Sequence, residues 1–358
     1  MERLLILNPG STSTKLAVFD EENSVFTESI SHTPEDLASF DWVADQYEFR
    51  RDLVLDNLKK HEIPLASLTA IVSRGGLLPP IKAGAYTVNE DMVWQLKNRP
   101  RNEHASNVGA MIAFSIGQQL GIPSYIYDGV TVDELTPINR ITGLPEMQRK
   151  GMGHNLNTRA AALRYARESG KAYADITVVV AHLGGGISVN LHHNGHIEDF
   201  INDEEGPFSP ERAGGLPIFD VIKACFKDGA TYKDMMKLVK SRGGLLAHLG
   251  TTDSREVEQK IATGDPQAKL VYDAMILNIA KNIGKLAPGV CGKLDAIVLT
   301  GGIANSRYVT DGISDYVSFL APVVVYPGED EMRALALGGL RVLRGVEFAE
   351  TFQRVENL

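Results

Sequence analysis

The residues best suited to chemistry gather in two short polar turns, each set between strand-like stretches. The first turn, NPGSTSTK at residues 8–15, interrupts LLILNPGSTSTKLAVFD at residues 4–20. The second, HLGGG at residues 182–186, interrupts a similar block at residues 176–197. Small residues in a tight turn can expose successive backbone N–H groups, which bind anions such as phosphate. We therefore predict two phosphate-binding turns, with a pair of plain hairpins as the alternative.

The glycine run of the second turn favours the binding interpretation. A plain hairpin needs at most one or two residues with positive φ, so close approach of the backbone to a ligand would account for the third glycine. The P-loop motif GxxxxGK[ST] does not occur, because Gly284-Lys285 is followed by Leu286 and Gly292-Lys293 by Leu294. The strand-to-helix phosphate site of P-loop enzymes is therefore excluded.

A third turn, TGGIANS at residues 300–306, follows the strand-like AIVL. It could pack against a flat ligand such as a nucleotide base or ribose, although Gly-Gly after a strand is often only a turn.

Alternating strands and helices must position these turns, which predicts an α/β fold. Further strands are expected at residues 70–72, 124–127, 296–299 and 323–326, and helices at 106–119, 156–169 after an Asn155 cap, 266–287 and 331–343. The long helix presents Leu270, Ala274, Leu277, Ala280 and Ile283 as a broad apolar face, which predicts a buried central helix. The two similar blocks suggest related halves in tandem, joined near residues 145–155.

The composition of the chain limits the classes of partner that we expect it to bind. The chain has 358 residues and a net charge of −9, and no Lys/Arg-rich run provides the basic face that nucleic acid requires, so we expect small-molecule partners. Cys225 and Cys291 are too far apart for a zinc site or a disulfide framework and are expected to be buried thiols. Because no stretch has the apolar length of a signal peptide or a membrane span, we expect no membrane partner and a cytoplasmic location.

Six motifs together resemble the acetate and butyrate kinase family, which belongs to the group sharing the actin, hexokinase and Hsp70 nucleotide-binding fold. They occur in the family's order over nearly the whole chain: NPGSTSTK (8–15), YDGV (127–130), HLGGGISV (182–189), PERAGG (210–215), TTDSRE (251–256) and TGGIANS (300–306). The shorter chain, and Asn-Pro-Gly where acetate kinases usually have Asn-Ala-Gly or Asn-Cys-Gly, resemble the butyrate kinase branch.

The resemblance implies two tandem related domains of the actin-like ATPase (ribonuclease H-like) type with an interdomain nucleotide cleft. An N-terminal acyl-substrate and phosphate domain would cover residues 1–150, and a nucleotide-binding domain would cover residues 151–329. A C-terminal helix within residues 330–358 would pack back onto the first domain. The implied reaction transfers phosphate from ATP, with Mg²⁺, to butyrate or a neighbouring short-chain carboxylate, giving acyl phosphate and ADP. A homodimer or a multiple of dimers is also implied.

The resemblance also assigns residues to the transfer. Asn8, Ser11 and Ser13 would contact phosphate or Mg²⁺-bound water, and Lys15 and Arg212 would neutralise the transferring charge. A loop arginine and a hairpin lysine with no such role are the alternatives.

Four further assignments leave alternatives open. Arg74 either replaces the family's second active-site arginine from a shifted position or does not. Asp128 would position an arginine or Mg²⁺, because a carboxylate substrate is already anionic at pH 7 and needs no general base. His104 and His154 lie near the places where the family has histidines at the transferred phosphoryl group, although helix capping would also explain them.

The nucleotide side is assigned in the same way. The residues implied are His182, Gly184, Gly185, Gly186, Asp253, Arg255, Gly301, Gly302, Ile303 and Asn305. Asp253 also reads as a helix N-cap with Glu256 at N3. Mg²⁺ would be held by Asn8 and Glu331, with Asp330 close behind, against the alternative that these acids only favour a helix N-terminus.

Two rival functions remain. One is an acetate or propionate kinase, because a pocket discriminates by only ~1–3 kcal/mol per methylene. The other is a nonenzymatic nucleotide-binding module of the actin or Hsp70 kind, which would not need both Arg74 and Arg212.

Overall fold

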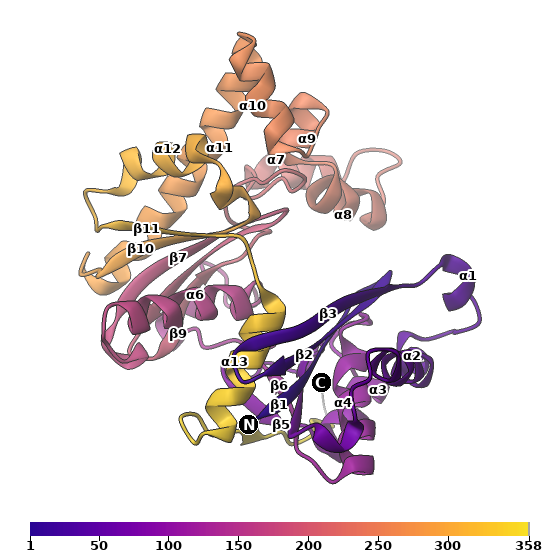
Figure 1. The fold of residues 1–358 in the computed structure, drawn as a ribbon. Helices are drawn as coiled ribbons and strands as arrows, with labels where there is room; N and C mark the ends of the chain where they lie inside the picture. The colour runs from indigo at the N-terminus through magenta and orange to yellow at the C-terminus, as the bar shows by residue number, and fades with distance from the viewer. Residues whose placement is uncertain (357–358) are drawn as a thin grey trace. The chain divides into compact units, whose positions relative to one another are not determined.

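A computed structural model describes residues 1–356, which divide into two compact units (Figure 1). Unit 1 comprises Met1–Asp133 and the C-terminal segment that begins at Asp330, and unit 2 comprises Glu134–Glu329. Of the predicted C-terminal segment, residues 357 and 358 lie outside the described residues. Within residues 1–356, no helix combines the length and apolar character that crossing a membrane would require.

Unit 1 is built on a seven-stranded sheet of order β12-β5-β6-β4-β1-β2-β3. Its strands are β1 (Arg3–Pro9), β2 (Ser13–Asp20), β3 (Asn23–Ser31), β4 (Ala70–Arg74), β5 (Ala85–Thr87), β6 (Ser124–Tyr127) and β12 (Glu350–Thr351). The first three strands form an antiparallel meander, and β1, β4 and β6 run parallel to one another.

Helices cover both faces of this sheet. They are α1 (Pro34–Leu37), η1 (Val43–Gln46), α2 (Tyr47–Lys60), η2 (Leu65–Ser67), α3 (Glu90–Asn98), α4 (Asn107–Leu120) and α13 (Glu331–Leu343). The side chains of β1 alternate, so that Leu5 and Leu7 join the core formed with α2 and α4. Leu4 points to the other face, where Gly338 and Gly339 of α13 leave room for Tyr127, Val72 and Leu4. The N-terminus of α13 is thereby placed near the carboxyl ends of β1 and β4.

Unit 2 repeats this strand order. Its five-stranded sheet, β11-β10-β7-β8-β9, consists of β7 (Thr177–Leu183), β8 (Ile187–His193), β9 (His196–Ile201), β10 (Ala296–Gly301) and β11 (Val323–Pro327). Again an antiparallel meander comes first; its first strand, β7, pairs in parallel with β10, which pairs in parallel with β11. Asn194 and Gly195 form the predicted β8–β9 hairpin, both with positive φ. The order β9-β8-β7-β10-β11 matches β3-β2-β1-β4-β6, so the two turns that opened the sequence analysis lie at equivalent places.

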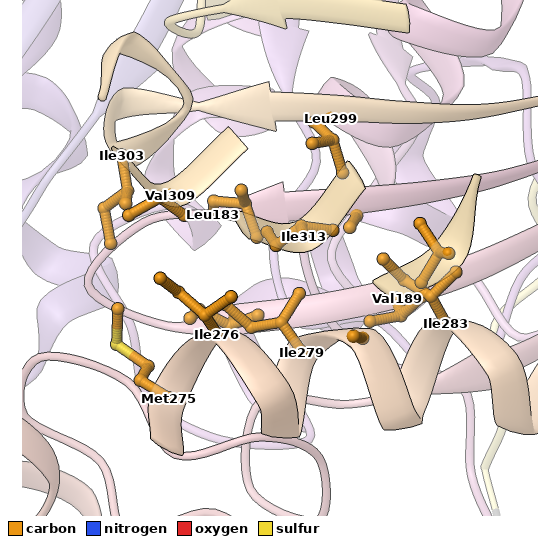
Figure 2. Close-up of a cluster of buried hydrophobic side chains, with 14 of the residues drawn as sticks. Leu183, Val189, Met275, Ile276, Ile279, Ile283, Leu299, Ile303, Val309 and Ile313 are labelled. Carbon is orange, nitrogen blue, oxygen red and sulfur yellow. The ribbon is translucent and has the colours of Figure 1, made fainter. Parts of the chain in front are cut away.

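The helices of unit 2 also lie on both sheet faces. They are α5 (Pro137–Arg140), α6 (Asn155–Glu168), η3 (Tyr173–Asp175), α7 (Ile218–Cys225), α8 (Tyr232–Ser241), α9 (Gly244–Leu249), α10 (Ser254–Ala262), α11 (Pro266–Leu286), η4 (Ala287–Val290), η5 (Gly302–Asn305) and α12 (Arg307–Val317). Ile276, Ile279 and Ile283 of α11 pack against Leu183 and Val189 of the sheet (Figure 2). Val178 and Val180 pack on the opposite face with α6.

The structure corrects four local predictions. Leu270 is 65% exposed, because α11 buries the face of Val271, Met275 and Ile279 and leaves the neighbouring stripe to solvent. The N-cap of α6 is His154, and Asn155 is already helical. Cys225 and Cys291 are both exposed. Cys225 lies on α7, which has no buried residue.

The division between units differs from the predicted one. The stretch 134–150 belongs to unit 2, where Glu134 accepts from the Ile197 N–H (2.9 Å) and Arg149 pairs with Asp199 (2.9 Å). Within the stretch 145–155 that suggested a join, Arg149 is thus tied to β9 of unit 2.

Candidate active site

The first turn is a tight connection at one edge of the unit 1 sheet. Asn8 and Lys15 lie directly opposite each other in the β1–β2 register, and the Gly10 N–H donates to Ser13 O (2.7 Å) to close the turn. Lys15 is exposed and lines the same cavity as Asn8. The turn therefore carries an amide and a cation side by side.

Parallel strands bring Arg74 to the same place. In the β1–β4 register Leu7 pairs with Ser73, so Asn8 and Arg74 follow at adjacent carboxyl ends. Both side chains contact Glu331 at the start of α13: the Asn8 amide donates to Glu331 Oε2 (2.6 Å), and the Arg74 guanidinium forms an ion pair with the carboxylate. Asp330 caps this helix by accepting from the Arg333 N–H (3.0 Å).

These residues surround a cavity of about 340 Å³ within unit 1. It brings together six of the predicted site residues: Asn8, Ser13, Lys15, Arg74, His104 and Glu331. Ser11 is exposed on the turn and does not line the cavity. Asp128 is buried after β6 with φ of 42°, and its Oδ1 accepts from the Gly84 N–H (2.7 Å). Asp128 is thus placed to hold the loop before β5.

The hydrogen bonding of His104 favours the neutral ring with its proton on Nε2. The Ser106 backbone N–H donates to its Nδ1 (3.1 Å), which requires a lone pair there. Desolvation, and secondly the positive charge of Arg74, lower the pKa of His104 below its usual value. His104 can therefore donate one neutral hydrogen bond from Nε2 to an anion in the cavity.

The second turn, between β7 and β8, is built differently. None of Gly184, Gly185 and Gly186 has a positive φ, so the glycines are not required by backbone conformation. Space explains two of the three: a Cβ at Gly184 would lie 2.8 Å from His182 Nε2, and one at Gly186 would overlap Asp203 Oδ2 and lie 3.1 Å from Arg212 Cζ. A Cβ at Gly185 would meet nothing closer than Glu211 Oε1 at 3.7 Å.

Arg212 is held in place by its own unit. Its guanidinium forms an ion pair with Asp203, and its backbone N–H donates to Ser209 Oγ (3.2 Å). Ser209 Oγ in turn donates to Gly185 O (2.5 Å). The Nε of Arg212 is buried and has no hydrogen-bond partner within residues 1–356. Arg212 is therefore linked to the glycine turn and has a spare donor.

The predicted histidines of unit 2 lie together. The rings of His154 and His182 stack with centroids 4.0 Å apart. His154 Nδ1 is 3.1 Å from Ser188 Oγ, and His182 Nδ1 is 3.0 Å from Asn157 Oδ1. Glu329 approaches His182 Nε2 at 3.7 Å. The stack joins the N-terminus of α6 to the end of β7, beside the glycine turn.

A cavity of about 920 Å³ opens beside this turn within unit 2. Seven of the residues predicted to bind the nucleotide line this cavity: Gly184, Gly185, Asp253, Arg255, Gly302, Ile303 and Asn305. The other three, His182, Gly186 and Gly301, do not line it. Gly301 has φ of +92° and packs its Cα against the Leu183 backbone, so it shapes the junction of β10 and β7.

Asp253 and Arg255 form a pair at the rim of this cavity. Arg255 Nη2 donates to Asp253 Oδ2 (2.6 Å), and the hydrogen bonds from Arg255 lower the pKa of Asp253 to about 2. Asp253 also caps α10 by accepting from the Arg255 N–H (2.9 Å), so the predicted cap is confirmed.

Seven further residues line the larger cavity and were assigned no role from the sequence: Pro210, Glu211, Thr252, Ser254, Glu258, Ser306 and Glu329. Glu258 Oε1 accepts from Ser306 Oγ (2.6 Å) and Tyr272 OH (3.1 Å). Glu258 lies on α10 and Ser306 caps α12, and only the packing of α10 and α12 against α11 brings them together. No spacing in the sequence signals that contact.

The predicted Mg²⁺ ligands do not form a closed metal site. Within residues 1–356, no group of three or more His, Cys, Asp or Glu side chains could hold an ion. Asn8 and Glu331 supply one amide and one carboxylate, which are oxygen donors that Mg²⁺ accepts when phosphate and water complete its shell. Both Glu331 oxygens face donors of the protein, Oε1 the Arg74 guanidinium and Oε2 the Asn8 amide, so a cation there would have to displace one of them.

Comparison with known proteins gives a consistent result. Residues 149–322 match the model of the acetokinase family. The chain is 46% identical to butyrate kinase 1 of Clostridium acetobutylicum over 355 residues, 99% of this chain and 100% of that protein. It is also 46% identical to butyrate kinase 2 of the same organism, over 98% of this chain and 99% of that protein. Among solved structures, it is similar to Porphyromonas gingivalis acetate kinase, with a TM-score of 0.77 at 18% identity, covering 96% of this chain and 100% of that chain, which shows the shared fold.

Proposed function

The chain belongs to the acetokinase family, and from this premise we propose that it transfers the γ-phosphoryl group of ATP to a short-chain carboxylate, with butyrate preferred. The near full-length identity to the two butyrate kinases carries this proposal. A carboxylate oxygen attacks the γ-phosphorus, the bond to the β–γ bridging oxygen breaks, and butyryl phosphate and ADP result. The reverse reaction follows the same path.

The chemistry explains why the site is rich in donors and has no evident base. Short-chain acids have a pKa of roughly 4.3–5, so the nucleophile arrives as an anion and no proton has to be removed. The barrier comes from bringing two anions together, which cations and hydrogen-bond donors lower. Lys15, Arg74 and the His104 Nε2 donor surround the smaller cavity and would serve this purpose for the acceptor side.

Arg74 is the cation best placed to receive a carboxylate. Its guanidinium already pairs with the Glu331 carboxylate, so the geometry for a carboxylate partner exists at this point. We assign the acyl substrate to the unit 1 cavity on this basis. Asp128 would act indirectly, by holding the loop at Gly84.

The nucleotide is assigned to the unit 2 cavity. Its volume of about 920 Å³ lies within the range of small-molecule and cofactor sites. The glycine turn would approach the phosphates through its backbone, and the loop Gly302–Asn305 with Asp253 and Arg255 would face the nucleoside. Arg212 would neutralise transferring charge, with His154 and His182 beside the same turn.

Mg²⁺, when bound with ATP, would neutralise phosphate charge, and Asn8 and Glu331 are the side chains of this chain that would face it. A homodimer or a multiple of dimers, which the family resemblance implies, and a cytoplasmic location, which the sequence pattern predicts, complete the proposal.

The test is a carboxylate series from two to six carbons with ATP and Mg²⁺, using hydroxylamine to trap acyl phosphate as hydroxamate. We expect the highest kcat/KM at four carbons, with activity on isobutyrate, valerate and propionate. Discrimination per methylene should be about 10–200-fold at most. A maximum at two or three carbons would replace butyrate by acetate or propionate. Nucleotide binding with no hydroxamate from any acid would favour a nonenzymatic module.

A further inference from the structure

Arg50 lies beneath the first phosphate turn and belongs to no motif of the sequence. It is on α2, and its side chain is fully buried. All of its donors are used: Nε and Nη2 bond Gln46 Oε1 (3.1 and 2.9 Å), and Nη1 bonds Gly10 O (2.9 Å) and Thr14 Oγ1 (3.1 Å). Every one of these acceptors is neutral.

The same guanidinium holds most of the turn's carbonyl groups. Besides Gly10 O, it lies within hydrogen-bond distance of Ser13 O (3.3 Å) and Ser11 O (3.4 Å). The remaining carbonyl, Thr12 O, accepts from the His32 N–H (2.8 Å). Four successive carbonyls are therefore bound by donors of the protein.

The N–H groups of the turn are left for a ligand. Over the part of the chain that the structure covers, the backbone N–H groups of Ser11 and Thr12 donate to no protein acceptor. Two adjacent N–H groups with no protein acceptor on a turn can bind an anion together.

Arg50 also brings a positive charge with no negative partner. Within residues 1–356, no ion pair joins it to a carboxylate, although buried charges in proteins are normally paired. Burial lowers the pKa of Arg50 to about 10, which leaves it protonated at pH 7. Its charge is one cause, after burial, of the lowered pKa of His32 nearby.

We propose that Arg50 is a positioning residue of the first turn: it holds the turn's carbonyl groups so that the Ser11 and Thr12 N–H groups receive phosphate, and its buried charge is neutralised by that phosphate. This inference rests on the proposed function for the identity of the phosphate, the transferring phosphoryl group. The binding of an anion by the turn does not depend on the proposed function.

The first arm of the test is kinetic. Arg50→Gln keeps a polar chain but removes the charge and most of the donors, and Arg50→Lys keeps the charge. We expect kcat for acyl phosphate formation to fall about 10–100-fold in Arg50→Gln, with Arg50→Lys recovering part of it and with the KM for ATP within twofold of wild type in both.

The second arm uses inorganic phosphate as the probe, with no nucleotide present. Phosphate should raise the melting temperature of the wild type above that in chloride of equal ionic strength, and Arg50→Gln should lose most of this increment. Val54→Ala is the matched control, because Val54 is a fully buried residue one turn along α2 that belongs to the hydrophobic core and carries no charge or hydrogen-bond donor in its side chain. It should lower the melting temperature yet keep both the increment and kcat.

Different results contradict the role of Arg50 and the proposed function. If Arg50→Gln keeps kcat within twofold and keeps the phosphate increment, the proposal is wrong. If Val54→Ala loses kcat to the same extent, Arg50 acts only through stability and the proposal is also wrong. If the wild type forms no acyl phosphate from any acid, the proposed function fails, and the phosphate increment alone decides the role of Arg50.

Discussion

The β1–β2 turn and the β7–β8 turn occupy equivalent places in two sheets of the same strand order, yet they supply charge in different ways. The first has a lysine on the following strand and a buried arginine beneath it. The second has three glycines, and its arginine lies beside it, anchored by Asp203. A repeated topology therefore decides where a turn lies, and the residues packed around the turn decide how it neutralises an anion.

The glycines show the same contrast. The first turn has room for polar side chains, because Arg50 packs against it through hydrogen bonds to its carbonyl groups. In the second, His182, Asp203 and Arg212 come so close to the backbone that side chains at Gly184 and Gly186 would collide with them. Arg50 thus contacts the first turn through its carbonyl groups, whereas His182, Asp203 and Arg212 lie beside the backbone of the second turn.

The largest effect should come from removing the anchored arginine. Arg212→Ala should lower kcat by at least ~10², because a donor and a charge at the transferring group are lost, while ADP affinity stays nearly intact. Steady-state kinetics and calorimetric titration with ADP measure the two quantities. Arg242→Ala removes an exposed arginine of the same unit and should change neither. Near-normal turnover in Arg212→Ala would show that the placement is mistaken.

A smaller effect should separate two neighbouring glycines. In Gly186→Ala the new methyl group must displace Asp203 and Arg212, so kcat should fall about 10-fold even at saturating ATP. In Gly185→Ala the methyl group projects near Glu211 at the cavity lining, so the KM for ATP should rise while kcat is kept. Equal effects of the two substitutions on kcat would contradict this account of the turn.

The last prediction concerns acid stability and leaves turnover at neutral pH aside. Burial lowers the pKa of His192 in unit 2 to about 3, and the charge of Arg159 adds to this. Because the folded pKa lies below the unfolded value of 6.5, the unfolded chain binds more protons below that pH, and the stability of unit 2 falls as the pH drops from about 6.5 toward 3.

His192→Gln isolates this contribution. Between pH 7.5 and pH 5.0 the wild type should lose about 2 kcal/mol more of its unfolding free energy than the variant, measured by urea denaturation at each pH. Parallel losses in both proteins would mean that other groups dominate the acid response.

The strand pattern could be predicted because it depends on local alternation. The strands at residues 70, 124, 296 and 323, the Asn194-Gly195 hairpin and the Asp253 cap all follow from neighbouring residue types. The fold class follows from the same pattern and is confirmed by the shared fold with an acetate kinase.

Contacts made across the fold could not be predicted. Arg50 lies about forty residues from the turn that it supports, in a helix whose sequence shows an ordinary charged segment, and Glu258 meets Ser306 only through helix packing. Leu270 was assigned to the wrong face because apolar residues on α11 outnumber those that the sheet can cover. The assigned catalytic and binding roles stay predictions.

The most direct test of the central claim is phosphorus NMR of the protein with ATP, Mg²⁺ and butyrate. Transfer to the carboxylate predicts an acyl phosphate resonance that grows in equal amount with ADP, and its loss when butyrate is omitted. ATP turned over to inorganic phosphate at the same rate with and without butyrate, or not consumed at all, would contradict the account.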